Sequence, residues 1–139
     1  MKANRCIPPC AVIPQVSYPE VTEGAAWLSQ AFGMQVRMRI ANHRVQMRFG
    51  NGALIVVERR ADDTRRSNTM LRVGDVDACC ARAAAVGGKL TGGPETYPYG
   101  ERQAHLEDFA GNQWVLSETV GDVDPTEFGF EVGPAFETN

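Results

Sequence analysis

The 139-residue sequence contains no apolar run of the roughly 18 residues that a membrane-spanning helix needs, and no apolar core of signal-peptide length near its start. It has two histidines, and none of its serines lies in a nucleophile-elbow sequence. The segment GGKLTGG lacks the spacing and the hydroxyl of a phosphate-binding loop. Two of the four cysteines are adjacent, and no second Cys/His pair joins Cys6 and Cys10. We therefore expect a cytoplasmic protein without membrane contact, disulfides or structural zinc.

Positive charge is missing from the last quarter of the sequence. All 14 lysines and arginines lie at or before Arg102, and the remainder holds eight acids and no base. The net charge of −3 and a pI near 5.4 argue against nucleic-acid binding. The apolar share of 43% is ordinary for one globular domain. Residues 59–67 are expected to be a solvated linker, and residues 119–139 an acidic tail with little order.

Apolar periodicity divides residues 12–58 into five elements. Val21, Ala25, Leu28 and Phe32 repeat at helical spacing, and Gly33 follows where a C-terminal cap would lie. Residues 12–18, 34–40, 43–49 and 53–58 have strand patterns. The last two are separated by Asn51-Gly52, which is a strong hairpin signal. The predicted order is β-α-β-β-β.

Residues 68–118 repeat this plan. Strands are predicted at 69–73, 101–107 and 113–118, a helix over 75–86, and a loop in the Gly- and Pro-rich segment that follows it. An offset of 55 residues places Gly33 on Gly88, and an offset of 60 places Phe49 on Phe109. The sequence therefore predicts internal duplication: an α+β domain of two βαβββ modules, with module one over about 12–58 and module two over about 68–118.

Strand parity separates a helix-covered face from a second face, which we call the open face. Trp114 falls on the helix side and is expected in the core. The open face is predicted to hold Arg37, Arg39, Gln46, Arg48, Ile55, Val57, Gln103, His105, Val115 and Ser117. Such a mixed face fits a small-molecule site, or alternatively a dimer interface or a wet surface. Tyr99 could close over it, and Arg102 could bind an anion or form a structural salt bridge.

Four short segments, AFGM, GDVDA, YGER and DFAGNQW, occur in an order that resembles the vicinal oxygen chelate superfamily. This group is also called the glyoxalase/bleomycin resistance/dioxygenase superfamily, and the resemblance is to its bleomycin-resistance-like branch. It implies that the two modules form a cupped mixed sheet with helices on the outer face, usually in a homodimer. Members include metal-dependent lyases, isomerases and dioxygenases, and also metal-free proteins that bind antibiotics.

The resemblance also implies where a metal would be held. In the metalloenzymes, His, Gln or Glu ligands come from the first and last strand of each module, and the matching positions here are Ile13, Ile55, Asn68 and Val115. Three of these side chains have no donor atom. Glu58 and Glu118 each lie three residues farther on, where strand parity turns them away from the open face. We therefore expect no metal and no other cofactor.

The sequence thus predicts a metal-free protein that binds and sequesters a small organic ligand, such as an antibiotic or a metabolite. The arginines of the open face favour an anionic or acceptor-rich ligand. The first alternative is a lyase or isomerase in which His105 acts as a base and Glu107 orients it. The second is a structural dimer whose cup is filled by its own side chains.

Overall fold

The computed structural model describes residues 1–136 and has two helices, eight strands and one short 3-10 helix in that range. In chain order the elements are β1 (Gln15–Tyr18), α1 (Val21–Phe32), β2 (Gln35–Ile40), β3 (Arg44–Phe49), β4 (Gly52–Glu58), β5 (Asn68–Arg72), α2 (Val76–Ala85), β6 (Lys89–Tyr97), β7 (Glu101–Glu107), β8 (Gln113–Thr119) and η1 (Pro125–Phe128). The predicted α+β fold of two tandem βαβββ modules is confirmed. Neither described helix has the length and apolar character needed to cross a bilayer.

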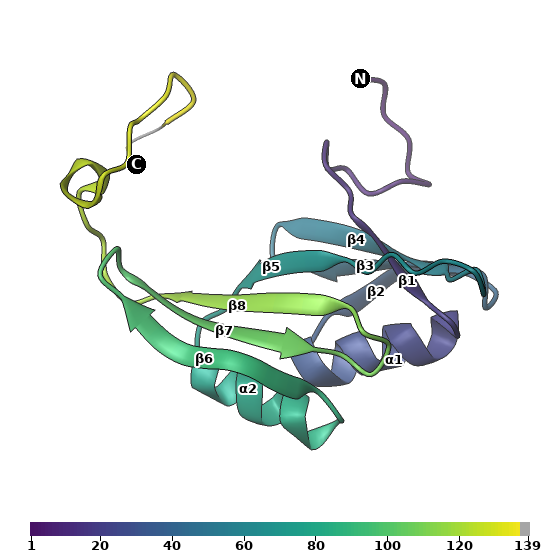
Figure 1. The fold of residues 1–139 in the computed structure, drawn as a ribbon. Coiled ribbons are helices and arrows are strands. Elements are labelled where there is room, and N and C mark those ends of the chain that lie inside the picture. The colour runs from purple at the N-terminus through teal and green to yellow at the C-terminus, as the bar shows by residue number, and fades with distance from the viewer. Residues whose placement is uncertain (137–139) are drawn as a thin grey trace.

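Each module forms its own four-stranded mixed sheet. The strand orders are β1-β4-β3-β2 and β5-β8-β7-β6, so the second sheet repeats the first. In each sheet the first strand runs parallel to the last, and the other neighbours are antiparallel. Figure 1 shows both helices on the same side of the two sheets, where α1 contacts α2. The expected cup therefore consists of two separate sheets, joined through their helices and turns rather than by strand pairing.

The two helices begin and end as their sequences indicate. Helix α1 has the predicted bounds, and Gly33 caps it in the left-handed conformation with a φ of 73°. At the start of α2, the Asp75 carboxylate accepts a hydrogen bond of 3.0 Å from the Ala78 N–H. Side chains on the inner face of α1, including Trp27, Leu28 and Phe32, are buried in a core that continues into module two.

One strand was missed by the sequence analysis. The Gly- and Pro-rich segment expected to be a loop is strand β6, which pairs with β7 along the outer edge of the second sheet. Its register shifts around Gly92 and again before Glu95. Because an edge strand can interrupt its ladder at such shifts, it accommodates Gly93 and Pro94 without losing its place in the sheet.

Two details of register in module one also differ from expectation. The turn between β3 and β4 is Gly50-Asn51, because Phe49 pairs with Gly52. A turn at Asn51-Gly52 would set Gln46 opposite Val57, but Gln46 lies opposite Ile55; a shift of two residues leaves the predicted faces unchanged. Strand β2 also has an irregularity between Val36 and Met38 that alters the face of the residues after it.

The turn between β7 and β8 holds the modules together. The buried Asp108 carboxylate accepts hydrogen bonds from the Tyr18 hydroxyl at 2.7 Å and from the Trp114 indole N–H at 3.1 Å, and so joins module one to module two. The Phe109 ring stacks on Tyr18. From the predicted solvated linker, Arg59 donates to the carbonyl oxygens of Ser17 and Ala110. This part of the linker is therefore a structural element.

Candidate functional site

The open face of module one is partly covered by the N-terminal arm, which we define as residues 1–13. The Arg37 guanidinium donates to the Gln46 side-chain oxygen and, at 3.1 Å, to the Arg5 carbonyl oxygen. The Gln46 amide donates to the Cys6 carbonyl oxygen at 2.8 Å. The arm therefore lies over the strands that were predicted to line the site, and Pro8 of the arm is buried.

A hollow of about 490 Å³ remains where the arm meets the edge of this sheet, and we call it the cationic hollow. Arg37 and Arg48 bring positive charge to it, and Arg48 is held by a 2.9 Å hydrogen bond to Gln35. The arm contributes Pro9 and Cys10. Sequence reasoning found the two arginines but missed the arm. Its signal was the stiff Pro8-Pro9 pair, which favours an extended segment.

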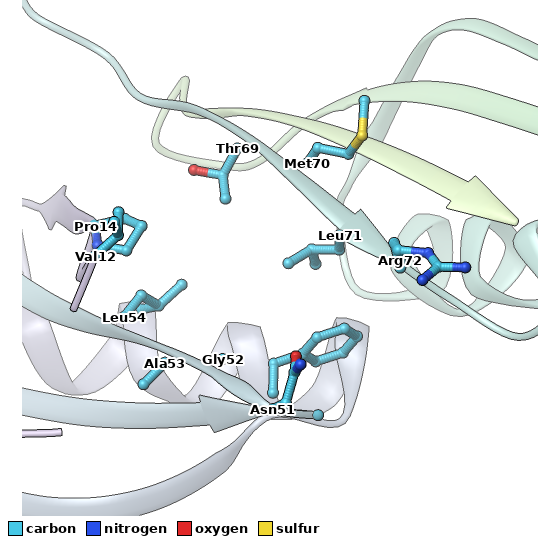
Figure 2. A pocket seen from close by; sticks show the side chains of 12 residues that line it. Val12, Pro14, Asn51, Gly52, Ala53, Leu54, Thr69, Met70, Leu71 and Arg72 are labelled. Atoms are coloured by element: carbon cyan, nitrogen blue, oxygen red, sulfur yellow. The ribbon is translucent and has the colours of Figure 1, made fainter. Parts of the chain in front are cut away.

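A second hollow, the apolar cleft, lies between the modules and has a volume of about 360 Å³. In Figure 2, Leu54 of module one faces Leu71 and Thr69 of β5 across the cleft, whereas Met70 and Arg72 point away from it. Val12 and Pro14 line the side nearest the arm. Except for Arg72, the residues that line the cleft are uncharged, so it suits the apolar part of a ligand.

The turn between β3 and β4 separates the two hollows. Residues 50–53 line both the cationic hollow and the apolar cleft. Gly50 has a φ of 54° at this turn, a conformation that favours glycine. A molecule with an apolar body and an anionic group can therefore place the body in the apolar cleft and the anionic group in the cationic hollow, on either side of one short turn.

The open face of module two has a different character. Gln103 lies opposite Ser117 and His105 lies opposite Val115, so these four residues share one face, as the strand parity predicts. The buried Ser117 hydroxyl accepts from the Gln103 amide at 3.0 Å and donates to the Glu101 carboxylate at 2.7 Å. The Tyr99 hydroxyl donates to the Gln103 side-chain oxygen at 3.4 Å. These polar groups hold one another in a closed network.

His105 is exposed and lies over Gly92 of β6. Within residues 1–136 no hydrogen bond joins its ring to Glu107 or to any other side chain. An imidazole acting as a general base is normally oriented by a partner on its second nitrogen. The geometry here does not supply that orientation.

Two predicted site residues, Arg39 and Arg102, do not lie on the open face. The irregularity in β2 places Arg39 opposite Val45, which belongs to the helix side. Arg102 reaches α2, where it forms two hydrogen bonds of 2.9 Å with the Asp77 carboxylate and lowers the pKa of that carboxyl below its usual range. Of the two roles considered for Arg102, the structure shows the salt bridge.

The remaining predicted residues keep their faces. In module one, Arg44, Gln46 and Arg48 alternate with buried Val45 and Met47. Opposite them on β4, Ile55 is buried and Val57 is half-buried.

The donor set does not fit the divalent metal that the family resemblance implies. Ile55 and Val115 lie on the open faces and offer only carbon, as does Ile13. Glu118 points to the helix side, as predicted, and accepts from the Val76 N–H at 2.8 Å. In the described chain it lies close to Asp75 and Asp77, but these three carboxylates are already occupied in capping α2 and pairing with Arg102.

Burial raises the pKa of three further groups, two thiols and one phenol. It raises the pKa of the Cys79 and Cys80 thiols, so the nucleophilic thiolate is disfavoured at both. Burial and the adjacent Asp108 carboxylate also raise the pKa of Tyr18 well above its ordinary value, which keeps this hydroxyl a donor. At the junction between the modules, Tyr18 therefore remains a hydrogen-bond donor to Asp108.

Comparisons with known proteins agree with the architecture. Residues 14–116 match the family model described as "Glyoxalase/Bleomycin resistance protein/Dioxygenase superfamily". No curated protein matches the sequence. The structure is similar to that of TioX from Micromonospora sp. ML1, with 20% identity over 83% of this chain and 100% of that chain and a TM-score of 0.67.

Two further solved structures extend this likeness. A glyoxalase/bleomycin resistance protein/dioxygenase family enzyme from Burkholderia phytofirmans PsJN is 19% identical over 76% of this chain and 94% of its own, with a TM-score of 0.66. A lactoylglutathione lyase from Agrobacterium tumefaciens is 18% identical over 88% and 99%, with a TM-score of 0.60. At these identities the likeness establishes the fold alone.

Proposed function

The chain belongs to the glyoxalase/bleomycin resistance protein/dioxygenase superfamily, and from this premise we propose that it binds and sequesters a small organic molecule without a metal ion. The observation that carries the proposal is the chemistry of four positions. Where metalloenzymes of the superfamily present His, Gln or Glu, this chain presents Ile13, Ile55, Asn68 and Val115. Three aliphatic side chains and one amide do not hold a divalent cation.

The two hollows of module one support a ligand of mixed character. Arg37 and Arg48 favour a carboxylate, a phosphate or another acceptor-rich group in the cationic hollow. Val12, Pro14 and Phe49 offer apolar surface in the cleft on the other side of residues 50–53, beside the buried Leu54 and Leu71. An antibiotic or secondary metabolite with an apolar body and an anionic group fits this arrangement, whereas a cationic ligand does not.

We also propose that the protein is a cytoplasmic homodimer. Among the described residues, the N-terminal arm is the segment that covers part of the open faces, so a second copy has room to complete the cup. Cys6, Cys10, Cys79 and Cys80 are all free thiols, which fits a reducing compartment.

Ligand binding is tested by thermal unfolding and calorimetry against a panel of aromatic acids, phosphorylated metabolites and antibiotics. A hit should bind at least about tenfold more weakly to Arg37→Ala and Arg48→Ala variants, because each substitution removes a charge-assisted hydrogen bond. Arg65→Ala is the matched control, because Arg65 is exposed and pairs with Asp63 in the linker. If only cationic compounds bind, or if the two variants bind as tightly as the parent, the proposed site is wrong.

The enzyme alternative is separated from binding by a metal measurement. Elemental analysis of the purified protein should find less than stoichiometric divalent metal, unchanged by His105→Ala. Stoichiometric metal that disappears on His105→Ala would replace the binding proposal with a lyase or isomerase centred on His105 and Glu107.

A further inference from the structure

The acidic tail combines exposed aromatic rings with unpaired negative charge. Its described part, residues 120–136, carries Phe128, Phe130 and Phe136, of which Phe130 is 52% and Phe136 is 48% exposed. Residues 137–139 of the tail lie outside the described chain. Within residues 1–136 no salt bridge involves the tail, and Glu127 and Glu131 have no cation beside them. Exposed apolar surface of this kind on a charged segment is typical of an interaction site.

Contacts with module two hold the first part of the tail in place. The Val120 N–H donates to the Gly100 carbonyl oxygen at 2.8 Å, and the Phe130 ring contacts the edge of the Tyr99 ring at a centroid distance of 6.3 Å. Asp124 caps the 3-10 helix by accepting from the Thr126 N–H. These contacts fix the root of the tail, but they leave about half of the surface of Phe128, Phe130 and Phe136 exposed.

A surface with the opposite character lies at the far end of module one. A groove of about 590 Å³, which we call the basic groove, is lined by Arg44, Arg59 and Arg60, with Val57 and Ala61 as its apolar residues. The exposed Arg60 lies 3.6 Å from the exposed Asp62 carboxylate, a surface pair that a docking carboxylate can replace. Its one carboxylate, Glu58, lies 3.9 Å from the His43 ring nitrogen. Ile40 pairs with Arg44 across β2 and β3, and at 64% exposure it adds uncovered apolar surface beside the groove.

The basic groove and the root of the tail lie at opposite ends of β8. The groove residue Arg59 donates to the Ala110 carbonyl oxygen, just before β8 begins, whereas the tail starts where β8 ends. A seven-residue strand separates these ends by about 20 Å. Figure 1 shows the tail running away from both sheets after β8. A groove on a second molecule is therefore the better match for the tail.

We propose that the acidic tail of one copy docks into the basic groove of a second copy. Carboxylates of Glu127 and Glu131 would meet Arg44 and Arg60, and the phenylalanine rings would cover Val57 and Ile40 and lie against guanidinium groups. Each copy offers one tail and one groove, so a two-fold dimer satisfies both contacts and closes. The contact lies at the opposite end of β3 from Arg48, so it leaves the cationic hollow open to ligand.

This inference rests on the proposed homodimer and adds the contact that holds the two copies together. The experiment is sedimentation velocity of the full chain over a range of concentrations and salt. The paired variants are Arg44→Glu with Arg60→Glu in the groove, and Glu127→Lys with Glu131→Lys in the tail. Arg59 is left intact because it holds the module junction.

Each pair of charge reversals should raise the dimer dissociation constant at least about tenfold, and all four together should return it to within about threefold of the parent. Phe128→Ala with Phe136→Ala should weaken the dimer without changing its salt dependence. Glu23→Lys with Glu95→Lys is the matched control, because it makes the same charge change on exposed residues outside the tail.

The outcomes separate the two proposals. A dimer that survives every tail and groove variant would overturn the tail contact and leave the homodimer standing. A chain that is monomeric at every concentration would overturn both, while ligand binding would still be decided by the calorimetry of the arginine variants. Rescue by the fourfold charge swap would support the contact even if one pair of substitutions lowers stability.

Discussion

Helix α1 of module one buries the large side chains Trp27, Leu28 and Phe32 in the shared core, where Phe32 meets Trp114 of module two, whereas the buried side chains of α2 are Val76, Cys80 and Ala83. The open faces differ as well. The face of module one carries arginines under an arm, and the face of module two carries a closed network around Ser117. Both modules nevertheless keep the same strand order.

This contrast indicates that duplication has preserved the backbone frame while the side chains have taken separate roles. Module one contributes most of the large apolar side chains of the helix layer and lines both hollows. Module two contributes the turn around Asp108 that holds the modules together. The following predictions are arranged from the largest expected effect to the smallest, and each tests one part of this contrast.

Asp108→Ala should have the largest effect, because it removes the junction on which both modules depend. The buried carboxylate accepts from the Tyr18 hydroxyl, the Trp114 indole and the N–H groups of Ala110 and Asn112. Leaving these donors unpaired should lower the free energy of unfolding by about 3–5 kcal/mol. Urea unfolding followed by tryptophan fluorescence measures this loss. Asp62→Ala, at an exposed site, is the control, and an equal loss in both variants would contradict the role of the junction.

Leu28→Ala and Cys80→Ala compare the two helices directly. The fully buried Leu28 should cost about 3 kcal/mol of unfolding free energy when truncated, because its removal leaves a cavity in the shared core. Cys80→Ala removes one sulfur atom from α2, whose buried side chains are smaller, and should lower the free energy of unfolding by about 1 kcal/mol. Chemical denaturation of the two variants measures both values. Equal costs would show that the helices contribute equally.

Gly24→Ala tests how closely α1 lies on its sheet. An added Cβ would come within 2.4 Å of the Tyr18 ring, so the helix or the ring must move, at a cost of about 1–3 kcal/mol. The offset of 55 residues places Cys79 at the equivalent position of α2, where a larger side chain is already accommodated. Thermal unfolding of Gly24→Ala should therefore show a lower midpoint, whereas Cys79→Ala should change it little.

Arg102→Ala should have the smallest effect on the fold and a clear effect on one titration. The Arg102 guanidinium lowers the pKa of Asp77 below its ordinary value of 3.8, so the pair stabilises the folded chain above that value, and this stabilisation is lost as the pH falls through the folded-state pKa. In the variant, an NMR titration should find the pKa of Asp77 raised toward 3.8. Arg65→Ala should leave it unchanged. Ligand binding should not respond to Arg102→Ala, because the side chain faces α2.

Local sequence patterns predicted much of the fold because the apolar side chains that form these patterns are also the ones that pack in the core. The periodicity of α1 and Gly33 gave the bounds of the first helix, and the alternation of β7 and β8 gave the face of His105 and Ser117. Strand β6 was missed because Gly92, Gly93 and Pro94 have low strand propensity. Its pairing with β7 is a tertiary interaction that overrides that preference.

The candidate site was predicted less completely, for two physical reasons. Alternation assigned Arg39 to the open face, but the irregularity after Val36 inserts a residue into the ladder and reverses the parity that follows. The Pro8-Pro9 pair indicates an extended arm but not where it docks, because Arg37 and Gln46 bind it through the carbonyl oxygens of Arg5 and Cys6. A backbone acceptor is present at every residue, so sequence alone does not mark the docking position.

The way in which the arm is held has an evolutionary consequence. Because Arg37 and Gln46 donate to main-chain oxygens of the arm, substitutions of Arg5 or Cys6 can accumulate without releasing the arm from the sheet. Pro9 and Cys10, which face the hollow, are therefore free to diversify while the scaffold beneath them stays constant. Homologues that differ mainly at Pro9 and Cys10 should therefore share this fold but prefer ligands of different chemistry.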